Sequence, residues 1–213
     1  AILAKDNYQL RIIYQTIGAV YYKSGNYELA LKYYYKGLML STNSLNDLPV
    51  AGILNNMGLI YMKVGDFESA LLVFKKWLDI KKLHNNTEGI ALSYSNLGEL
   101  YLSVDSTEKA EYWFNKSLEL SEQINDMEGV AYVYYALSKV YSITNRYEEA
   151  KESCLKAKEI AIDKNNLELI ADSYFRLGKI KEITGYKDDA IQYYAMSFDM
   201  ATQCNYSSTI LNS

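Results

Sequence analysis

The sequence predicts an all-α protein, a right-handed solenoid of antiparallel helix pairs. The first observation is an internal repeat, because residues 18, 58, 98, 138 and 178 lie 40 residues apart and all are small. The second is that each repeat contains two stretches with the apolar periodicity of amphipathic helices. The third is that Pro49 is the only proline, and an interior proline costs a helix about 3 kcal/mol. Five units in register predict a stacked repeat array.

The stretch 54–80 shows the logic of one unit. In its first half, apolar and small residues recur at the spacing of one helix face: Leu54, Met57, Gly58 and Tyr61. After a short turn the pattern returns with Phe67, Ala70, Leu71 and Phe74. The glycine and alanine let the two helices approach closely, and the aromatic rings fill the space around them. A single pair cannot bury both faces, so pairs are expected to stack on one another.

The units follow one another along a single predicted array over residues 1–213. They lie at about 7–44, 47–84, 87–124, 127–164 and 167–204. The first pair is expected at 7–23 and 27–42, with Asp6 or Asn7 as the N-cap. Residues 1–5 align with the end of a second helix, and 205–213 align with the start of a sixth first helix. These partial units indicate a piece of a longer protein.

The linkers between pairs share a polar signature. They read Ser-Leu-Asn-Asp at 44–47, His-Asn-Asn at 84–86, Asn-Asp at 125–126 and Asn-Asn at 165–166. Asparagine tolerates the left-handed conformation that ends a helix, and asparagine or aspartate can cap the next one. Glu88, Glu128 and Glu168 then fall in a first helical turn, where a carboxylate suits the helix dipole.

Composition argues against several functional classes. The net charge is −4 with no basic stripe, so this segment is not expected to bind nucleic acid directly. No apolar run reaches the roughly 20 residues of a membrane span. Cys154 and Cys204 lack metal-site spacing and are expected to be free thiols, buried at Cys154 and at a helix end at Cys204. His84 is the single histidine, lies in a linker and has no catalytic partner. We therefore expect no enzyme, no cofactor and no metal site.

The units resemble the tetratricopeptide repeat family. With Gly58 as position 8 of a unit, the shared pattern is a small residue at 8, tyrosine at 11, alanine at 20 and an aromatic at 24. The chain departs from the family in its period, about 34 residues in the common form, and in lacking the proline after the second helix. Ser138, Cys154 and Lys181 also depart from the pattern. The longer period is similar to the subclass found in kinesin light chain, the Leu-Gly-Asn repeat protein and bacterial peptide-sensing regulators.

The first helices are expected to line the concave side, with positions 5, 6 and 9 on the face away from the packed one. This face supplies the candidate residues for binding a protein or peptide partner: Asn55, Asn56, Asn96, Glu99, Tyr135, Lys139, Arg176 and Lys179. The resemblance implies that Asn56 and Asn96 form a ladder of amides that holds an extended peptide. The alternative is that they only bond neighbouring helices.

Two interpretations are also open for the three cations on this face. Arg176, with Lys139 and Lys179 in phase, is suited to an acidic side chain or a carboxylate, and the alternative is a solvated helix face. A hydrogen bond contributes about 1 kcal/mol, whereas micromolar binding needs about 8 kcal/mol. Apolar pockets must therefore supply most of the affinity.

The resemblance implies a protein- or peptide-binding module, the sensory or regulatory part of a larger bacterial signalling protein with a histidine kinase or transcriptional regulator. The alternative is a structural scaffold for assembly or homo-oligomerisation, including a homodimer, with no small ligand. The compartment stays open, with the cytoplasm favoured, or the periplasm if the parent is a membrane sensor.

Overall fold

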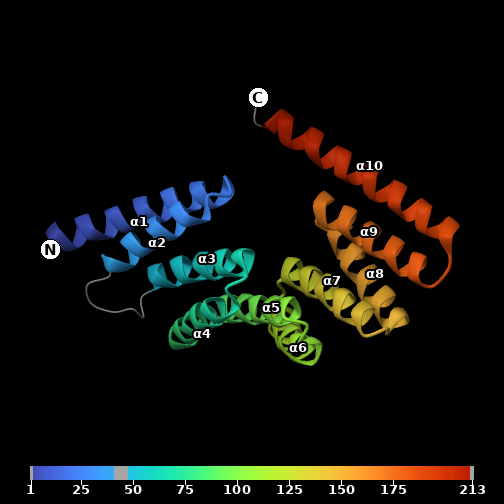
Figure 1. Ribbon diagram of the computed structural model, residues 1–213, viewed down its shortest axis with the longest axis horizontal. Coiled ribbons are helices and arrows are strands. Elements are labelled where there is room, and N and C mark those ends of the chain that lie inside the picture. The colour runs from blue at the N-terminus through green and yellow to red at the C-terminus, as the bar shows by residue number, and fades with distance from the viewer. Residues whose placement is uncertain (1, 41–47, 212–213) are drawn as a thin grey trace. The chain divides into compact units, whose positions relative to one another are not determined.

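The computed structural model describes residues 2–40 and 48–211, which form ten α-helices and no strand (Figure 1). The helices are α1 (Ile2–Lys23), α2 (Tyr27–Met39), α3 (Leu48–Val64), α4 (Phe67–Leu83), α5 (Thr87–Ser103), α6 (Thr107–Gln123), α7 (Met127–Ile143), α8 (Tyr147–Asp163), α9 (Leu167–Ile183) and α10 (Lys187–Leu211). The predicted all-α superhelix of antiparallel helix pairs is confirmed.

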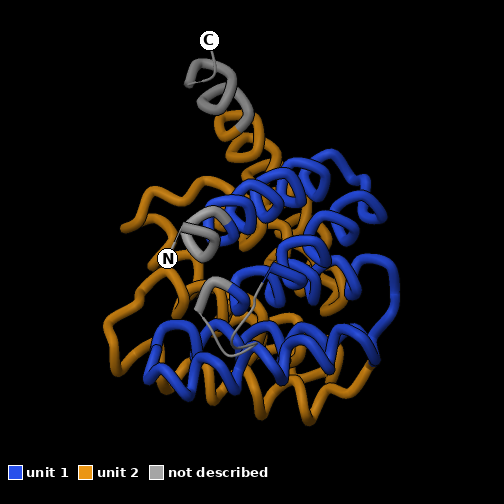
Figure 2. Tube along the Cα trace, turned by 90° about the vertical axis from the view of Figure 1, so that its left-hand side faces the viewer, with its two compact units in different colours: residues 1–104 blue, residues 105–213 orange. Residues whose placement is uncertain are grey.

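The chain divides into two compact units, residues 1–104 and residues 105–213 (Figure 2). Unit 1 contains α1 to α5 and unit 2 contains α6 to α10. Inside each unit every helix packs on the next one along the chain. The continuity of one array over all 213 residues stays a prediction.

The turns inside a pair place one residue in the left-handed region. In the second pair this residue is Gly65, with φ 79°, and Asp66 follows it as the N-cap of α4. Glycine pays no steric penalty at this φ. The Asp66 side chain accepts a hydrogen bond from the amide of Ser69, which would otherwise lack a partner in the first turn.

The linkers between pairs confirm the predicted roles of asparagine and aspartate. Asn85, Asn125 and Asn165 have φ of 50°, 55° and 53°. The residue after each one caps the next helix, since the side chains of Asn86, Asp126 and Asn166 accept hydrogen bonds from first-turn amides. The predicted linker at 44–47 lies outside the described residues.

Two predicted helix boundaries are wrong. Helix α1 begins at Ile2, so there is no cap at Asp6 or Asn7. Helix α10 continues through Asn205 to Leu211 instead of ending near residue 204, which also places Cys204 inside the helix rather than at its end. Neither region contains glycine or proline, and asparagine accepts the α conformation as well as the left-handed one, so Asn205 alone does not end a helix.

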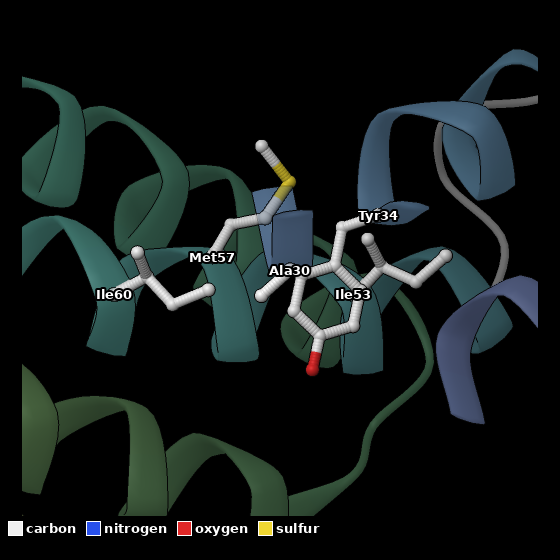
Figure 3. Close-up of a cluster of buried hydrophobic side chains, with 5 residues drawn as sticks. All are labelled: Ala30, Tyr34, Ile53, Met57 and Ile60. Atoms are coloured by element: carbon white, nitrogen blue, oxygen red, sulfur yellow. The ribbon is translucent and has the colours of Figure 1, made fainter. Parts of the chain in front are cut away.

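The core lies between successive helices of each unit. Within a pair, Gly18 allows the ring of Tyr34 so close that an added Cβ would lie 2.6 Å from its Cε1 atom. Between pairs, α2 contributes Ala30 and Tyr34, and α3 contributes Ile53, Met57 and Ile60 (Figure 3). All five side chains are buried. Cys154 takes the aromatic position of its unit, and its thiol is free and buried, as the sequence predicts.

Candidate functional site

The candidate residues of unit 1 lie on α3 and α5, the two first helices that follow α1. Asn96 Nδ2 donates a hydrogen bond to Asn55 Oδ1 at 2.8 Å, and both side chains are half-buried. This bond joins position 6 of one unit to position 5 of the unit before it. It uses one donor and one acceptor, so the two amides together keep further capacity for a ligand.

Asn56 does not share in this amide pair. It lies beside the hydroxyl of Tyr34, where burial raises the pKa of the phenol and the amide of Asn56 offsets part of the rise. Glu99 follows Asn96 by three residues on α5 and is half-buried. The structure therefore pairs Asn96 with Asn55, and it places Asn56 against the second helix of the preceding pair.

The candidate residues of unit 2 gather around the ring of Tyr135. Lys139 Nζ lies 4.8 Å from the ring centroid, and the guanidinium carbon of Arg176 lies 5.9 Å from it. Both distances suit a cation over an aromatic face. Arg176 Nε is buried and has no hydrogen-bond acceptor among the described residues. Tyr135 and Arg176 again connect position 5 of one unit with position 6 of the next.

A pocket of about 230 Å³ adjoins this cluster, between α7 and α9. It is lined by Glu128, Tyr132, Tyr135, Asn166, Glu168, Leu169 and Asp172. Burial, and then the neighbouring charge of Glu168, raise the pKa of Asp172, while Lys139 and Arg176 act in the opposite direction. The face of unit 2 thus has three carboxylates, Glu128, Glu168 and Asp172, in the pocket that Tyr135 lines, and two cations near the ring of Tyr135.

Lys179 lies apart from this cluster. Its ammonium is 3.4 Å from Glu182 Oε2 and 6.0 Å from the centroid of the Phe175 ring. These three residues line a groove beside α10 instead of the pocket beside α7. Of the three predicted cations, Lys139 and Arg176 come together and Lys179 does not join them.

The sequence did not identify the acidic residues of the unit 2 face as part of a candidate site. Glu128 and Glu168 are first-turn acids, and the sequence explained them by the helix dipole alone. Asp172 stands at position 2, where the earlier units have isoleucine, glycine, leucine and tyrosine. This departure from the repeat was the signal that could have identified it.

The chemistry available on both faces is hydrogen bonding, cation–aromatic contact and charge. Among the described residues no group of three histidine, cysteine or acidic side chains could hold a metal ion. The same part of the chain contains no helix of the length and apolar character that crossing a membrane requires. Stacked helix pairs with a polar first-helix face define a protein-interaction module, a type of fold that is typically a scaffold without catalysis.

The chain belongs to the tetratricopeptide repeat family. One tetratricopeptide repeat model matches residues 49–123, and a second matches residues 13–44, 131–161 and 171–201. Together they cover most of the chain, and each match contains helices of the 40-residue units. Among curated proteins, none matches the sequence.

Solved structures share the fold at low identity. Aspartyl phosphate phosphatase F from Bacillus subtilis matches with a TM-score of 0.81 at 16% identity, over 95% of this chain and 53% of its own. A Rap protein complexed with competence and sporulation factor gives 0.79 at 19% identity, over 90% of this chain and 54% of its own. BtubC from P. vanneervenii gives 0.71 at 18% identity, over 88% and 78% respectively.

Proposed function

We propose that the chain is the peptide-binding, sensory or regulatory part of a larger bacterial signalling protein. The observation that carries the proposal is Arg176. Its Nε is buried and unpartnered, and its guanidinium lies against Tyr135 at the edge of a pocket. A buried donor without an acceptor costs about 1–3 kcal/mol, and a ligand carboxylate or carbonyl at this place would relieve that cost.

The amide pair of unit 1 supports the same role. Asn55 and Asn96 hold each other in place, which orders the remaining donor and acceptor groups before a ligand arrives. Ordering of this kind reduces the entropy lost on binding. An extended peptide main chain offers the complementary carbonyl and amide groups.

The signalling context has support from the fold alone. A Rap protein of the same fold has been solved as a complex with competence and sporulation factor. At 19% identity this likeness is one of architecture, so the peptide and the output of this chain are parts of the proposal. We infer that ligand binding on the first-helix face changes the packing between neighbouring pairs and so signals to an attached histidine kinase or transcriptional regulator.

Selection from a displayed random-peptide library tests binding. The wild-type chain serves as bait, with counter-selection on Arg176→Ala/Asn96→Ala. Enriched peptides should bind the wild type and lose at least about tenfold in affinity on the double variant, because each lost polar contact to a ligand is worth about 1 kcal/mol. Lys151→Ala, an exposed cation on α8, is the matched control and should bind as the wild type does.

Two results would contradict the proposal. One is the absence of any enriched peptide. The other is enriched peptides that bind the double variant and the wild type equally. The signalling context has a separate test, since the full coding sequence that contains these residues should also encode a kinase or DNA-binding domain.

An assembly scaffold is the second candidate. The observation that favours it is the exposure of large apolar side chains on the first and last helices, among them Ile13 on α1 and Phe198 on α10.

A further inference from the structure

Three carboxylates line the pocket between α7 and α9. Glu128 comes from the first turn of α7, and Glu168 and Asp172 come from α9, one helical turn apart. Both helices are interior to unit 2, with α6 before them and α10 after them. None of the ion pairs that join the described residues includes any of these three side chains. No direct partner therefore offsets the repulsion between Glu168 and Asp172.

The repeat explains two of these acids but not the third. Glu128 and Glu168 lie in first helical turns, where a carboxylate suits the helix dipole. Asp172 lies one turn further along α9, beyond the reach of that effect, and like charges four residues apart destabilise a helix. The corresponding residue of α5 is Leu92. Asp172 thus lowers the stability of the free chain, and a positively charged ligand would remove that cost.

The shape and the walls of the pocket suit a cation larger than a metal ion. In the part of the chain that the structure describes, no three acidic, histidine or cysteine side chains are grouped so that they could hold a metal. The pocket has a volume of about 230 Å³, several times the volume of about 30 Å³ that one water molecule takes in the liquid. Tyr132, Tyr135 and Leu169 supply aromatic and aliphatic walls. Surfaces of this kind bind organic cations.

The cations of the same face indicate how much charge the ligand carries. Lys139 and Arg176 lie near the ring of Tyr135, and neither lines the pocket. Their charges act to lower the pKa of Asp172, against the larger effects of burial and of Glu168. Three carboxylates and two cations leave one negative charge in excess, which a single ammonium or guanidinium group would neutralise.

We propose that the pocket between α7 and α9 binds an alkylammonium or alkylguanidinium group, with its charge among the three carboxylates and its aliphatic chain along Tyr132 and Leu169. The group belongs either to a lysine or arginine side chain of a peptide or to a free amine, since both present the same chemistry. The site takes the charge opposite to the one that Arg176 takes in the proposed function. It therefore does not rest on the Arg176 contact.

NMR titration of the full chain at neutral pH tests the proposal. The probes are n-pentylammonium and Nα-acetyl-lysine-N-methylamide, and their uncharged counterparts are 1-pentanol and the equally blocked norleucine. Each cation should bind at least about tenfold more tightly than its counterpart, because hydrogen bonds to a charged group are roughly twice as strong as neutral ones. Tighter binding of the blocked lysine identifies a peptide side chain as the source, and tighter binding of n-pentylammonium identifies a free amine.

Three variants locate the site. Asp172→Asn keeps the size and removes the charge, so it should weaken both cations at least about tenfold. Glu88→Gln is the matched control, since Glu88 is the first-turn acid of α5 at the repeat position of Glu168, and it should bind as the wild type does. Arg176→Ala removes a like charge and should bind n-pentylammonium at least as tightly as the wild type. The peptides of the proposed function should instead be weakened by that change, so failure of one proposal is distinguishable from failure of the other.

Three results would overturn the proposal. The cations could bind no better than their uncharged counterparts, Asp172→Asn could bind them as tightly as the wild type, or Glu88→Gln could weaken them as much as Asp172→Asn does. Circular dichroism checks that each variant is folded. Glu168→Gln removes a second charge from the pocket and gives the same test independently of Asp172.

Discussion

Asn96 donates a hydrogen bond to Asn55 across 41 residues of sequence, and Arg176 lies on the ring of Tyr135 at the same separation. Both contacts join position 5 of one unit to position 6 of the next. Successive first helices therefore meet through one register relationship, filled by two amides in unit 1 and by a cation and an aromatic ring in unit 2. The same positions are the ones the sequence assigns to ligand binding.

A double-mutant cycle on Asn55 and Asn96 should measure this relationship. We expect the two alanine substitutions to couple by about 0.5–1.5 kcal/mol in the free energy of unfolding, the usual net value of a hydrogen bond. Urea denaturation of the full chain, followed by circular dichroism, gives the four free energies of unfolding that the cycle needs.

Asn56 is the control for this cycle. It lies against Tyr34 and not against Asn96, so the Asn56→Ala and Asn96→Ala effects should add. Strong coupling of Asn56 with Asn96, and none for Asn55, would restore the amide ladder expected from the sequence.

The helix caps in the linkers and turns should matter for stability. Asn86 and Asp66 accept hydrogen bonds from the amides of Gly89 at 2.6 Å and Ser69 at 3.1 Å. Replacing either by alanine should lower the free energy of unfolding by about 1 kcal/mol. Ser106 occupies the same place before α6 and makes no such bond, so Ser106→Ala should cost less than about 0.5 kcal/mol. Equal losses at all three sites would show that the cap bonds are not the cause.

Much of the fold could be predicted from the sequence because the same helix-pair pattern occurs in five successive units. A period of 40 residues locates each helix pair, and Asn85, Asn125 and Asn165 mark where second helices end. The ends of the chain have no neighbouring unit to supply the same information, which is why the boundaries of α1 and α10 were misplaced.

The candidate site was less predictable for a related reason. Position along a repeat indicates which face a side chain occupies, and it correctly groups Tyr135 with Lys139. It does not indicate which neighbour a long side chain reaches. Lys179 turns to Glu182, and Asn96 reaches Asn55 instead of its equivalent Asn56, because rotamers and local charge decide these contacts.

Close packing at position 8 predicts a large effect for a single methyl group. A Cβ added to Gly178 would lie 2.6 Å from Cε1 of Tyr194, so Gly178→Ala should destabilise by about 1–3 kcal/mol through overpacking. Gly52→Ala is the control, since its Cβ would meet only the flexible amide end of Gln15 at 3.0 Å. Alanine is also the better helix former by about 1 kcal/mol, so the control should not lose stability. Thermal melting of both variants distinguishes them.

The two thiols should differ sharply in reactivity. Cys154 is buried, its thiol donates to Ser173, and burial raises its pKa to about 12. Because the thiolate is the reactive form, Cys154 should resist Ellman's reagent in the folded chain. Cys204 is half-buried and should react first.

Native protein treated with Ellman's reagent should therefore release one equivalent of thionitrobenzoate quickly and the second only on unfolding. Cys204→Ser should abolish the fast phase. A fast phase that persists in Cys204→Ser would mean that α8 opens readily.

The raised pKa of Asp172 predicts how stability depends on pH. Burial and the charge of Glu168 make the folded chain hold this proton to a higher pH than the unfolded chain, whose carboxyl has the ordinary pKa of 3.8. The folded state then binds more protons than the unfolded state between the two pKa values, so stability falls as pH rises through that interval. Above the raised pKa of the folded chain, the whole destabilisation caused by the buried carboxylate remains.

Asp172→Asn has nearly the same size without the charge, so it should melt higher than the wild type at neutral pH. The difference should shrink as the pH falls towards 3.8 and vanish below it. Melting curves of both proteins across this range provide the measurement. An Asp172→Asn variant that melts lower at neutral pH would show that the carboxylate acts mainly as a partner for Lys139 and Arg176.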